Sequence, residues 1–162
     1  MTFADHPPTG IVRFVLRGPI LLYRLGLGRL LDHHLLLIIH RGRTSHLLRE
    51  SVVEVVRFET ASKTCVVMSG WSGKTDWYRN ISREPALEIR IGATRFVPQQ
   101  RLLSPEETIG ELQRYVERHP WLARNVLARG FDVTLDGTDA SWNKAADFFR
   151  GVQFAPAETG DR

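Results

Sequence analysis

Short runs of strand-forming residues, joined by tight polar turns, fill the middle of this 162-residue chain and limit the folds it can adopt. In residues 86–91, apolar and charged side chains alternate, as in a strand with one buried face. Gly92-Ala93 then suits a two-residue hairpin turn with glycine first. The runs cover residues 35–39, 51–58, 64–69, 86–91 and 95–102. We therefore expect antiparallel strands joined by hairpins, which are the makings of a small barrel.

Helices are expected on either side of these strands. Ser104-Pro105-Glu106-Glu107 combines a capping box with proline at the first helical position. Further helices are expected at residues 75–83, 121–129 and 141–150. The fold class is therefore mainly β with flanking helices (α+β). We expect one domain over residues 19–150, a loose and partly disordered leader over 1–18, and a frayed tail over 151–162.

Residues 20–31 are apolar on most sides of a helix that would begin at Pro19. This segment is shorter than the ~20 apolar residues that span a membrane, and Arg24 and Arg29 interrupt it. Two interpretations stay open: the segment covers one end of the core, or it lines an active-site mouth or lies on a membrane surface. No secretory signal peptide is recognisable, so we expect a cytoplasmic protein with membrane association left open.

Positive charge is concentrated in the first third of the chain. The net charge is +4, and residues 1–49 hold seven arginines against two aspartates, which leaves −1 for the rest. A basic segment of this kind favours an anionic partner, namely a phosphate-bearing cofactor, an anionic membrane or a nucleic acid. Because no nucleic-acid motif accompanies the charge, we do not expect a nucleic-acid partner.

The sequence lacks the motifs that mark common enzyme active sites. The chain has no His-Glu-x-x-His, Gly-x-Ser-x-Gly, Walker-type or Cys-x-x-Cys pattern. The histidines at 33, 34, 40 and 46 lack a carboxylate or cysteine at suitable spacing, so we expect no metal site. The single cysteine, Cys65, excludes an internal disulfide and lies in an apolar run that favours a buried, inert thiol.

Two segments have the composition of a phosphate-binding or ring-binding site. Residues 40–46 form a Gly-bearing, Arg-rich turn with two hydroxyl groups, directly after an apolar strand. Alone, this pattern is equally typical of a basic surface turn. Residues 69–80 follow another strand, are rich in Gly and Ser, and lead into a helix start where backbone amides can bind an anion. Trp77 in this segment is also a good candidate for a core anchor.

The order of these motifs resembles the deazaflavin-dependent nitroreductase family of split-barrel oxidoreductases. The resemblance covers residues 17–130 and rests on Gly42-Arg43-Thr44-Ser45, Ser69–Lys74 and Asp76-Trp77-Tyr78-Arg79-Asn80-Ile81, followed by Glu84-Pro85 and Ser104–Glu107. It implies a split β-barrel of about six antiparallel strands, related to flavin-mononucleotide-binding proteins. Coenzyme F420 (8-hydroxy-5-deazaflavin) would bind in its cationic groove.

Carried over by position, the family's cofactor contacts fall on two loops and a helix start. They are Arg41, Arg43, Thr44 and Ser45, then Ser69, Gly70, Trp71, Ser72, Gly73 and Lys74, then Asp76, Trp77, Tyr78 and Asn80. The chain departs from the family pattern at Thr44, where a basic residue is common, and at His46, where glycine is common. Arg41 would offset the missing positive charge.

The resemblance also implies an activity, in which the cofactor carries the chemistry and no protein nucleophile is needed. A reduced deazaflavin would transfer a hydride to a small acceptor such as a quinone, an enone or a nitroaromatic compound. Tyr23, Tyr115 and Trp121 are the candidates for the acceptor side. Two alternatives stay open: a flavin-mononucleotide (FMN) enzyme of the same fold, and a non-catalytic cofactor-binding module. Split barrels of this type often pair, which leaves a homodimer open as well.

Overall fold

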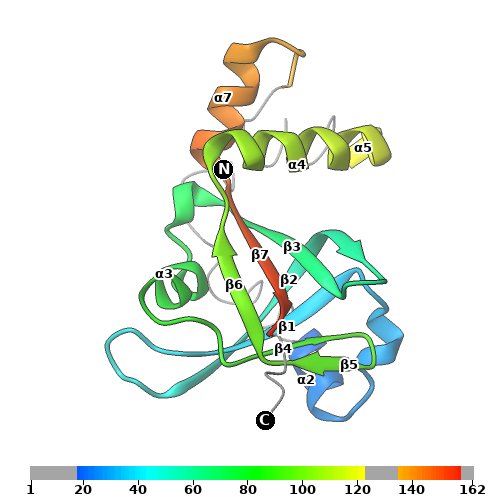
Figure 1. Cartoon of the computed structure of the whole chain (residues 1–162), viewed down its shortest axis with the longest axis vertical. Helices are drawn as coiled ribbons and strands as arrows, with labels where there is room; N and C mark the ends of the chain where they lie inside the picture. The colour runs from blue at the N-terminus through cyan, green and yellow to red at the C-terminus, as the bar shows by residue number, and fades with distance from the viewer. Residues whose placement is uncertain (1–17, 123–134, 158–162) are drawn as a thin grey trace.

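The computed structural model describes residues 18–122 and 135–157 as a curled antiparallel sheet with helices around it (Figure 1). The order of the strands in the sheet is β5-β4-β1-β2-β3-β7-β6. The strands are β1 (Leu35–Arg41), β2 (Leu48–Glu59), β3 (Thr64–Ser69), β4 (Glu88–Ile91), β5 (Thr94–Phe96), β6 (Pro98–Leu102) and β7 (Arg150–Pro156). The helices are α2 (Gly18–Arg24), η1 (Gly28–Leu31), η2 (Trp71–Gly73), α3 (Asp76–Arg83), α4 (Pro105–Arg118), α5 (Pro120–Leu122) and α7 (Asp139–Phe148).

The chain itself brings the two edges of the sheet together. β5 and β6 occupy opposite edges, yet only Val97 separates them in sequence, so the sheet must curl until the edges meet. The amide of Ala157 donates to the Val97 carbonyl (2.9 Å) at this seam. The nearly closed barrel confirms the expected split-barrel class, with seven strands where about six were expected. One extra strand arises because the expected run 95–102 divides here.

The prediction of a frayed tail after residue 150 is wrong for residues 151–156. These residues form most of β7, which lies between β3 and β6, with Val152 and Phe154 fully buried. Gly151 makes this placement feasible, because a Cβ there would lie 2.7 Å from Leu103 Cδ1 and 3.0 Å from the Thr108 hydroxyl. The alternation Val152-Gln153-Phe154 was the available strand signal. Residues 1–17, 123–134 and 158–162 lie outside the described residues, so the leader and most of the helix expected at 121–129 remain predictions.

The barrel core consists of aliphatic side chains from both halves of the sheet. Its largest fully buried members are Leu36, Leu37, Ile38, Ile81, Ile89, Ile91, Val66, Val67, Val152 and Phe154. Cys65 is also fully buried, and burial raises the pKa of its thiol to about 12, as expected for an inert cysteine. The expected hairpins at residues 59–63 and 92–93 are confirmed by the β2–β3 and β4–β5 pairings.

Helices cover the two ends of the barrel (Figure 1). At one end, α4 packs against α7 and β2, and it begins with the expected capping box at Ser104. Glu111 of α4 is buried and accepts from the Arg57 Nε of β2 through both carboxylate oxygens (3.1 Å each). At the other end lies α2, whose Tyr23 is buried and donates to the Leu35 carbonyl (2.6 Å).

The apolar N-terminal segment covers the barrel with only part of its surface. Tyr23 is 5% exposed, whereas four leucines of the same segment face outward. They are Leu21, Leu25, Leu27 and Leu30, exposed by 58, 63, 44 and 74%. The interpretation as a cover for the core therefore holds for the tyrosine side of the segment. Among the described residues, none of the helices is both long enough and apolar enough to cross a membrane.

Candidate functional site

A groove of about 450 Å³ opens between the β1–β2 hairpin and α3. Its walls come from the turn 42–45 and the start of β2 on one side, and from the first turns of α3 on the other. It is lined by His40, Gly42, Arg43, Thr44, Ser45, Arg49, Glu50, Ser51, Asp76, Trp77 and Asn80. The structure thus brings together six of the predicted cofactor contacts, from two segments more than 30 residues apart: Arg43, Thr44, Ser45, Asp76, Trp77 and Asn80.

Asn80 ties the two walls of the groove to each other. Its side chain is 4% exposed, and its Oδ1 accepts from the Arg43 backbone amide and from the Arg43 guanidinium, each at 3.0 Å. Its Nδ2 lies 3.3 Å from the Nδ1 of His40. Since Oδ1 is already used as an acceptor, the amide nitrogen donates to His40. This buried amide therefore fixes the turn 42–45 against α3. Asn80, a predicted cofactor contact, thus has a structural role.

The turn is shaped so that its hydroxyl groups and a cation face the groove. A Cβ on Gly42 would lie 2.6 Å from the Ser45 hydroxyl, so only glycine lets this hydroxyl fold back over the turn. Arg49 Nη2 reaches the same hydroxyl at 3.5 Å. Within the described part of the chain, Arg49 has no ion pair, whereas Arg43 pairs with Asp76 (2.9 Å). Arg49 is thus the uncompensated cation of the groove.

Sequence reasoning missed Arg49, Ser51 and His40 as site residues. The signal was available: Arg49 and Ser51 stand two positions apart, and alternate residues of a strand share a face. The strand was expected to start at Ser51, whereas β2 begins at Leu48. That three-residue difference left Arg49 outside the expected strand and hid its pairing opposite His40 in β1.

His40 forms the buried floor of the groove. It is 2% exposed, and its Nε2 lies 3.2 Å from the Ser51 hydroxyl. Nδ1 lies near both the Asn80 amide (3.3 Å) and the Arg41 carbonyl (3.4 Å). In the tautomer in which Nδ1 accepts from Asn80, Nε2 carries the hydrogen and donates it to Ser51, which leaves the Ser51 hydroxyl proton for the groove. Burial lowers the pKa of His40 and outweighs the opposing hydrogen bond to the Arg41 carbonyl, with Arg49 lowering the pKa further and Asp76 raising it. The imidazole is therefore neutral at neutral pH.

The lowered His40 pKa predicts an acid-sensitive fold. Below about pH 6.5 the unfolded chain binds a proton at this position that the folded chain resists. Stability should therefore fall as pH drops from about 6.5, by up to about 1.4 kcal/mol per pH unit for this one group. Urea unfolding of the wild type and of His40→Gln at pH 7.5 and pH 5.0 measures this. The variant should lose less stability between the two pH values, whereas His46→Gln, at an exposed histidine, should behave as the wild type.

Trp77 and Asp76 complete the α3 wall. Trp77 is half-buried, packs against the barrel core and meets Tyr78 edge-on, with ring centroids 5.9 Å apart. It therefore combines the expected role of a core anchor with a place in the groove lining. Asp76 lies in the first turn of α3, where a negative charge complements the helix dipole. The N-terminal end of α3 is therefore already occupied by the Asp76 carboxylate.

The second predicted loop, residues 69–74, lies against α7 and the start of β7. Trp71 packs on Phe148, with ring centroids 6.1 Å apart, and the Ser69 hydroxyl bonds that of Thr75 (2.6 Å). Trp71, Ser72 and Gly73 all have positive φ, at 53°, 53° and 74°. A Cβ on Gly73 would lie 2.8 Å from the Tyr78 ring. Ser69, Gly70, Trp71, Ser72, Gly73, Lys74 and Tyr78 do not line the groove, so their cofactor contacts stay a prediction.

The remaining predicted residues also lie outside the groove lining. Arg41 turns to Glu84 (3.4 Å) and to the His46 carbonyl (3.3 Å). Tyr23 lies at the opposite end of β1, where burial raises its pKa to about 12. Tyr115 donates to Glu54 and lies tilted against the His119 ring, with centroids 4.8 Å apart, and burial raises its pKa. Trp121 is 69% exposed in α5. The acceptor-side assignment of these three aromatic residues therefore stays a prediction.

The donor set of the groove suits one chemical class of ligand. It offers an uncompensated arginine, hydroxyl groups of Ser45, Thr44 and Ser51, and the indole of Trp77. Guanidinium and hydroxyl groups bind phosphate oxygens, and an indole presents a flat face to an aromatic ring. Within residues 18–122 and 135–157, no group of three His, Cys, Asp or Glu side chains could hold a metal ion. A flat ligand carrying a phosphate fits this groove.

Comparisons with known proteins agree with that ligand class. Residues 24–129 match the family described as F420H(2)-dependent quinone reductase. The structure of an F420-H2 dependent reductase (FDR-A) has a TM-score of 0.50 at 17% identity, covering 76% of this chain and 95% of that one. A structure described as a domain-swapped dimer has a TM-score of 0.52 at 16% identity, covering 90% and 99%. No curated protein matches. The chain therefore belongs to the F420H2-dependent quinone reductase family and is an oxidoreductase whose hydride donor is reduced coenzyme F420.

Proposed function

We propose that the groove between the β1–β2 hairpin and α3 is the F420 site of this enzyme. The observation that carries the proposal is the uncompensated Arg49, held beside the Ser45 hydroxyl and across the groove from Trp77. F420 combines a flat tricyclic ring with a phosphate and carboxylates, and these are the groups that this donor set suits. The Gly42 turn, locked by Asn80, would keep the donors in position before the cofactor arrives.

The proposed roles of the residues follow from their chemistry. Reduced F420 supplies a hydride from its ring carbon when bound, so the protein has to bind, orient and shield rather than attack. Arg49, Ser45 and Thr44 would hold the phosphate, and Trp77 would support the ring. Neutral His40 fixes the Ser51 hydroxyl so that its proton points away from the imidazole. Ser51 would then donate to an oxygen that gains negative charge in the groove.

A quinone is the acceptor class we propose first. Its carbonyl oxygens gain negative charge on reduction, and the groove offers hydroxyl donors for that charge. Enones and nitroaromatic compounds present similar oxygens and are the second choice. Steady-state turnover of reduced F420 with a short-chain quinone, a cyclic enone and a nitroaromatic compound ranks the three. A kcat/KM for the quinone below those of both rivals would contradict this order.

Replacing Arg49 by glutamine should weaken F420 binding about tenfold while leaving the fold intact. The exposed guanidinium makes a charge-assisted contact worth roughly 1.5 kcal/mol with an anion and has no ion pair among the described residues to lose. Quenching of intrinsic tryptophan fluorescence on titration with oxidised F420 gives the dissociation constant, and thermal unfolding checks the fold.

Arg83→Gln is the matched control, because Arg83 is an exposed arginine of α3 that does not line the groove. Equal affinity in the two variants would contradict the proposed site.

Lys74→Gln tests the second loop in the same titration. A parallel titration with FMN tests the flavin alternative, and tight FMN binding without a response to F420 would favour it over the deazaflavin.

For the assembly, we infer a homodimer. Support comes from the domain-swapped dimer among the structural neighbours. Sedimentation equilibrium at micromolar concentrations gives the mass directly, and a monomer under those conditions would contradict the inference.

Contact of the N-terminal segment with a membrane surface also stays a proposal. It is motivated by the exposed leucines of this segment.

A further inference from the structure

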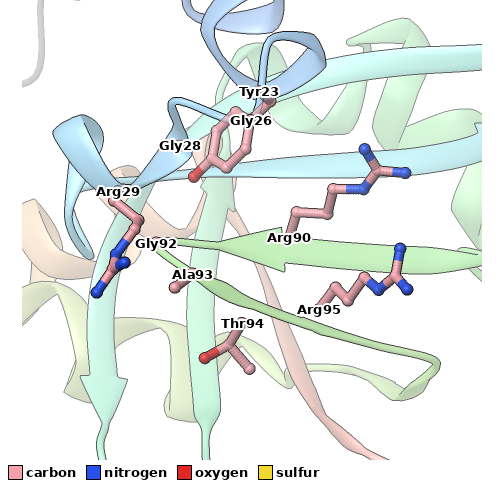
Figure 2. Close-up of a pocket in the computed structure, with 9 residues that line it drawn as sticks. All are labelled: Tyr23, Gly26, Gly28, Arg29, Arg90, Gly92, Ala93, Thr94 and Arg95. Atoms are coloured by element: carbon pink, nitrogen blue, oxygen red, sulfur yellow. The ribbon is translucent and has the colours of Figure 1, made fainter.

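Figure 2 shows a second pocket, whose volume is about 310 Å³. It lies at the opposite end of β1 from the groove. The β4–β5 hairpin forms one wall, and α2 with η1 forms the other. Its lining residues are Tyr23, Gly26, Gly28, Arg29, Arg90, Gly92, Ala93, Thr94 and Arg95. The walls meet closely, since a Cβ on Gly28 would lie 2.6 Å from the Tyr23 ring and 2.9 Å from the Gly92 carbonyl.

Two arginines stand directly opposite each other in this hairpin. Arg90 of β4 pairs with Arg95 of β5 in the sheet register, and both side chains project to the same side (Figure 2). Like charges in directly opposed positions have Cβ atoms about 5 Å apart and destabilise an antiparallel pair. Arg29 of η1 adds a third guanidinium to the lining of the same pocket. The pocket therefore concentrates positive charge.

Nearby carboxylates cancel only part of this charge. Glu88 pairs with Arg90 (2.5 Å), and Asp32 pairs with His33 (2.9 Å). Among the described residues, neither Arg29 nor Arg95 has an ion pair, and both are exposed. Two cations of the pocket are thus left for an external anion. The Thr94 hydroxyl supplies a neutral hydrogen-bond donor beside them (Figure 2).

We propose that this pocket is a binding site for a phosphate group, distinct from the cofactor groove. Guanidinium groups bind phosphate oxygens through paired N–H donors, and a bound phosphate would supply Arg29 and Arg95 with the negative charge that they lack among the described residues. The pocket volume accommodates a phosphate together with a small organic group. The separation from the groove is several strand residues at about 3.3 Å each, so one small ligand cannot fill both sites.

Two sources can supply the phosphate, namely a soluble phosphate ester and the headgroup of an anionic lipid. Exposed Leu25, Leu27 and Leu30 lie on the segment that forms one wall of the pocket. Apolar side chains beside a basic pocket also suit an amphiphile. The shared chemistry is the phosphate, and the experiment has one arm for each source.

The test is a residue-resolved titration of the full chain. Inorganic phosphate, and then glycerol 3-phosphate, is added at constant ionic strength while backbone amide shifts are followed by NMR. Saturable shifts of Gly92, Ala93, Thr94 and Arg95 are expected in the wild type and in Arg49→Gln. They should be lost in Arg29→Gln/Arg95→Gln and kept in the charge-matched control Arg83→Gln/Lys144→Gln. No shift of residues 92–95 with either phosphate compound, or equal shifts in the double variant, would overturn the soluble arm.

The second arm uses vesicles of phosphatidylcholine alone or with three-tenths phosphatidylglycerol. If the source is a lipid, the anionic vesicles bind the chain more tightly, and the double variant loses about fivefold per arginine, about 25-fold in all. Binding to both vesicle types alike, together with no response to the soluble phosphates, would refute the proposal.

Removing Arg95 relieves a repulsion, so Arg95→Gln should unfold at the same temperature as the wild type or higher when no phosphate is present. Turnover with F420 should stay unchanged in the double variant.

Discussion

Replacing Phe154 by alanine should lower the free energy of unfolding by about 3–5 kcal/mol. The ring is fully buried in the centre of β7 and contributes to the core that both halves of the sheet share. Its removal leaves a cavity that neighbouring strands cannot fill, because β3 and β6 hold β7 from both sides. For a domain with a typical stability of about 5–15 kcal/mol, a loss of this size leaves a marginal fold. Urea denaturation followed by circular dichroism measures the difference.

Gln153→Ala is the matched control for Phe154. Gln153 is the next residue of the same strand, points to the other face and accepts a hydrogen bond from Arg101 at 3.3 Å. Its loss should cost about 1 kcal/mol or less, because the contact is exposed. Similar small losses for both variants would mean that residues 150–156 contribute little to the fold and would revive the prediction of a frayed tail.

Asn80→Ala is expected to reduce both stability and cofactor affinity. Truncation leaves the Arg43 amide without its acceptor and His40 without its donor, at a cost of about 2–4 kcal/mol for the buried groups together. The turn 42–45 then loses its attachment to α3, and the hydroxyl groups and arginines that it positions are no longer preorganised. F420 should therefore bind at least about tenfold more weakly. Thermal unfolding and fluorescence titration measure the two effects separately.

Asn80→Asp separates the two functions of this amide. The carboxylate keeps an acceptor for the Arg43 amide and guanidinium but cannot donate to His40 Nδ1. We expect this variant to retain more cofactor affinity than Asn80→Ala. A carboxylate facing the imidazole should also favour its protonated form, so stability at pH 5.0 should fall less relative to pH 7.5 than in the wild type. Identical behaviour of the two variants would show that the hydrogen bond to His40, rather than those to Arg43, holds the groove together.

Local patterns predicted the hairpins and helix starts of this fold well. The β4–β5 turn follows from Gly92, whose φ of 54° favours glycine, and the start of α4 follows from the capping box at Ser104. These features depend on residues close in sequence, so a short window contains their cause. Residue patterns predicted hairpins that could form a small barrel, and the family resemblance added the split-barrel class.

The strands that the sequence did not predict depend on pairings between residues far apart in the chain. The run 95–102 looks continuous, but β5 pairs with β4 and the segment after Val97 pairs with β7, whose residues come 50 or more positions later. β7 itself contains Gly151 and Pro156, which weaken a strand prediction, and only the space beside Leu103 and Thr108 shows why glycine is required.

The candidate site shows the same division between local and distant causes. The turn 42–45 was predictable from its composition, as was the start of α3. The hydrogen bonds from Arg43 to Asn80 were not, because they join residues 37 apart. Arg49 was missed through a strand boundary placed three residues late, which is the usual weak point of such predictions.

Synthesis on a ribosome delivers the strands of this barrel out of spatial order. β3 ends at Ser69 and β6 at Leu102, but β7, which lies between them, begins at Arg150. Translation at about 5–20 residues per second therefore leaves two unpaired strand edges on the nascent chain for several seconds after β6 is made. Such edges are templates for pairing with other chains. A pause in translation between residues 103 and 149 should raise the aggregated fraction of the product, and this vulnerability belongs to the topology rather than to any single side chain.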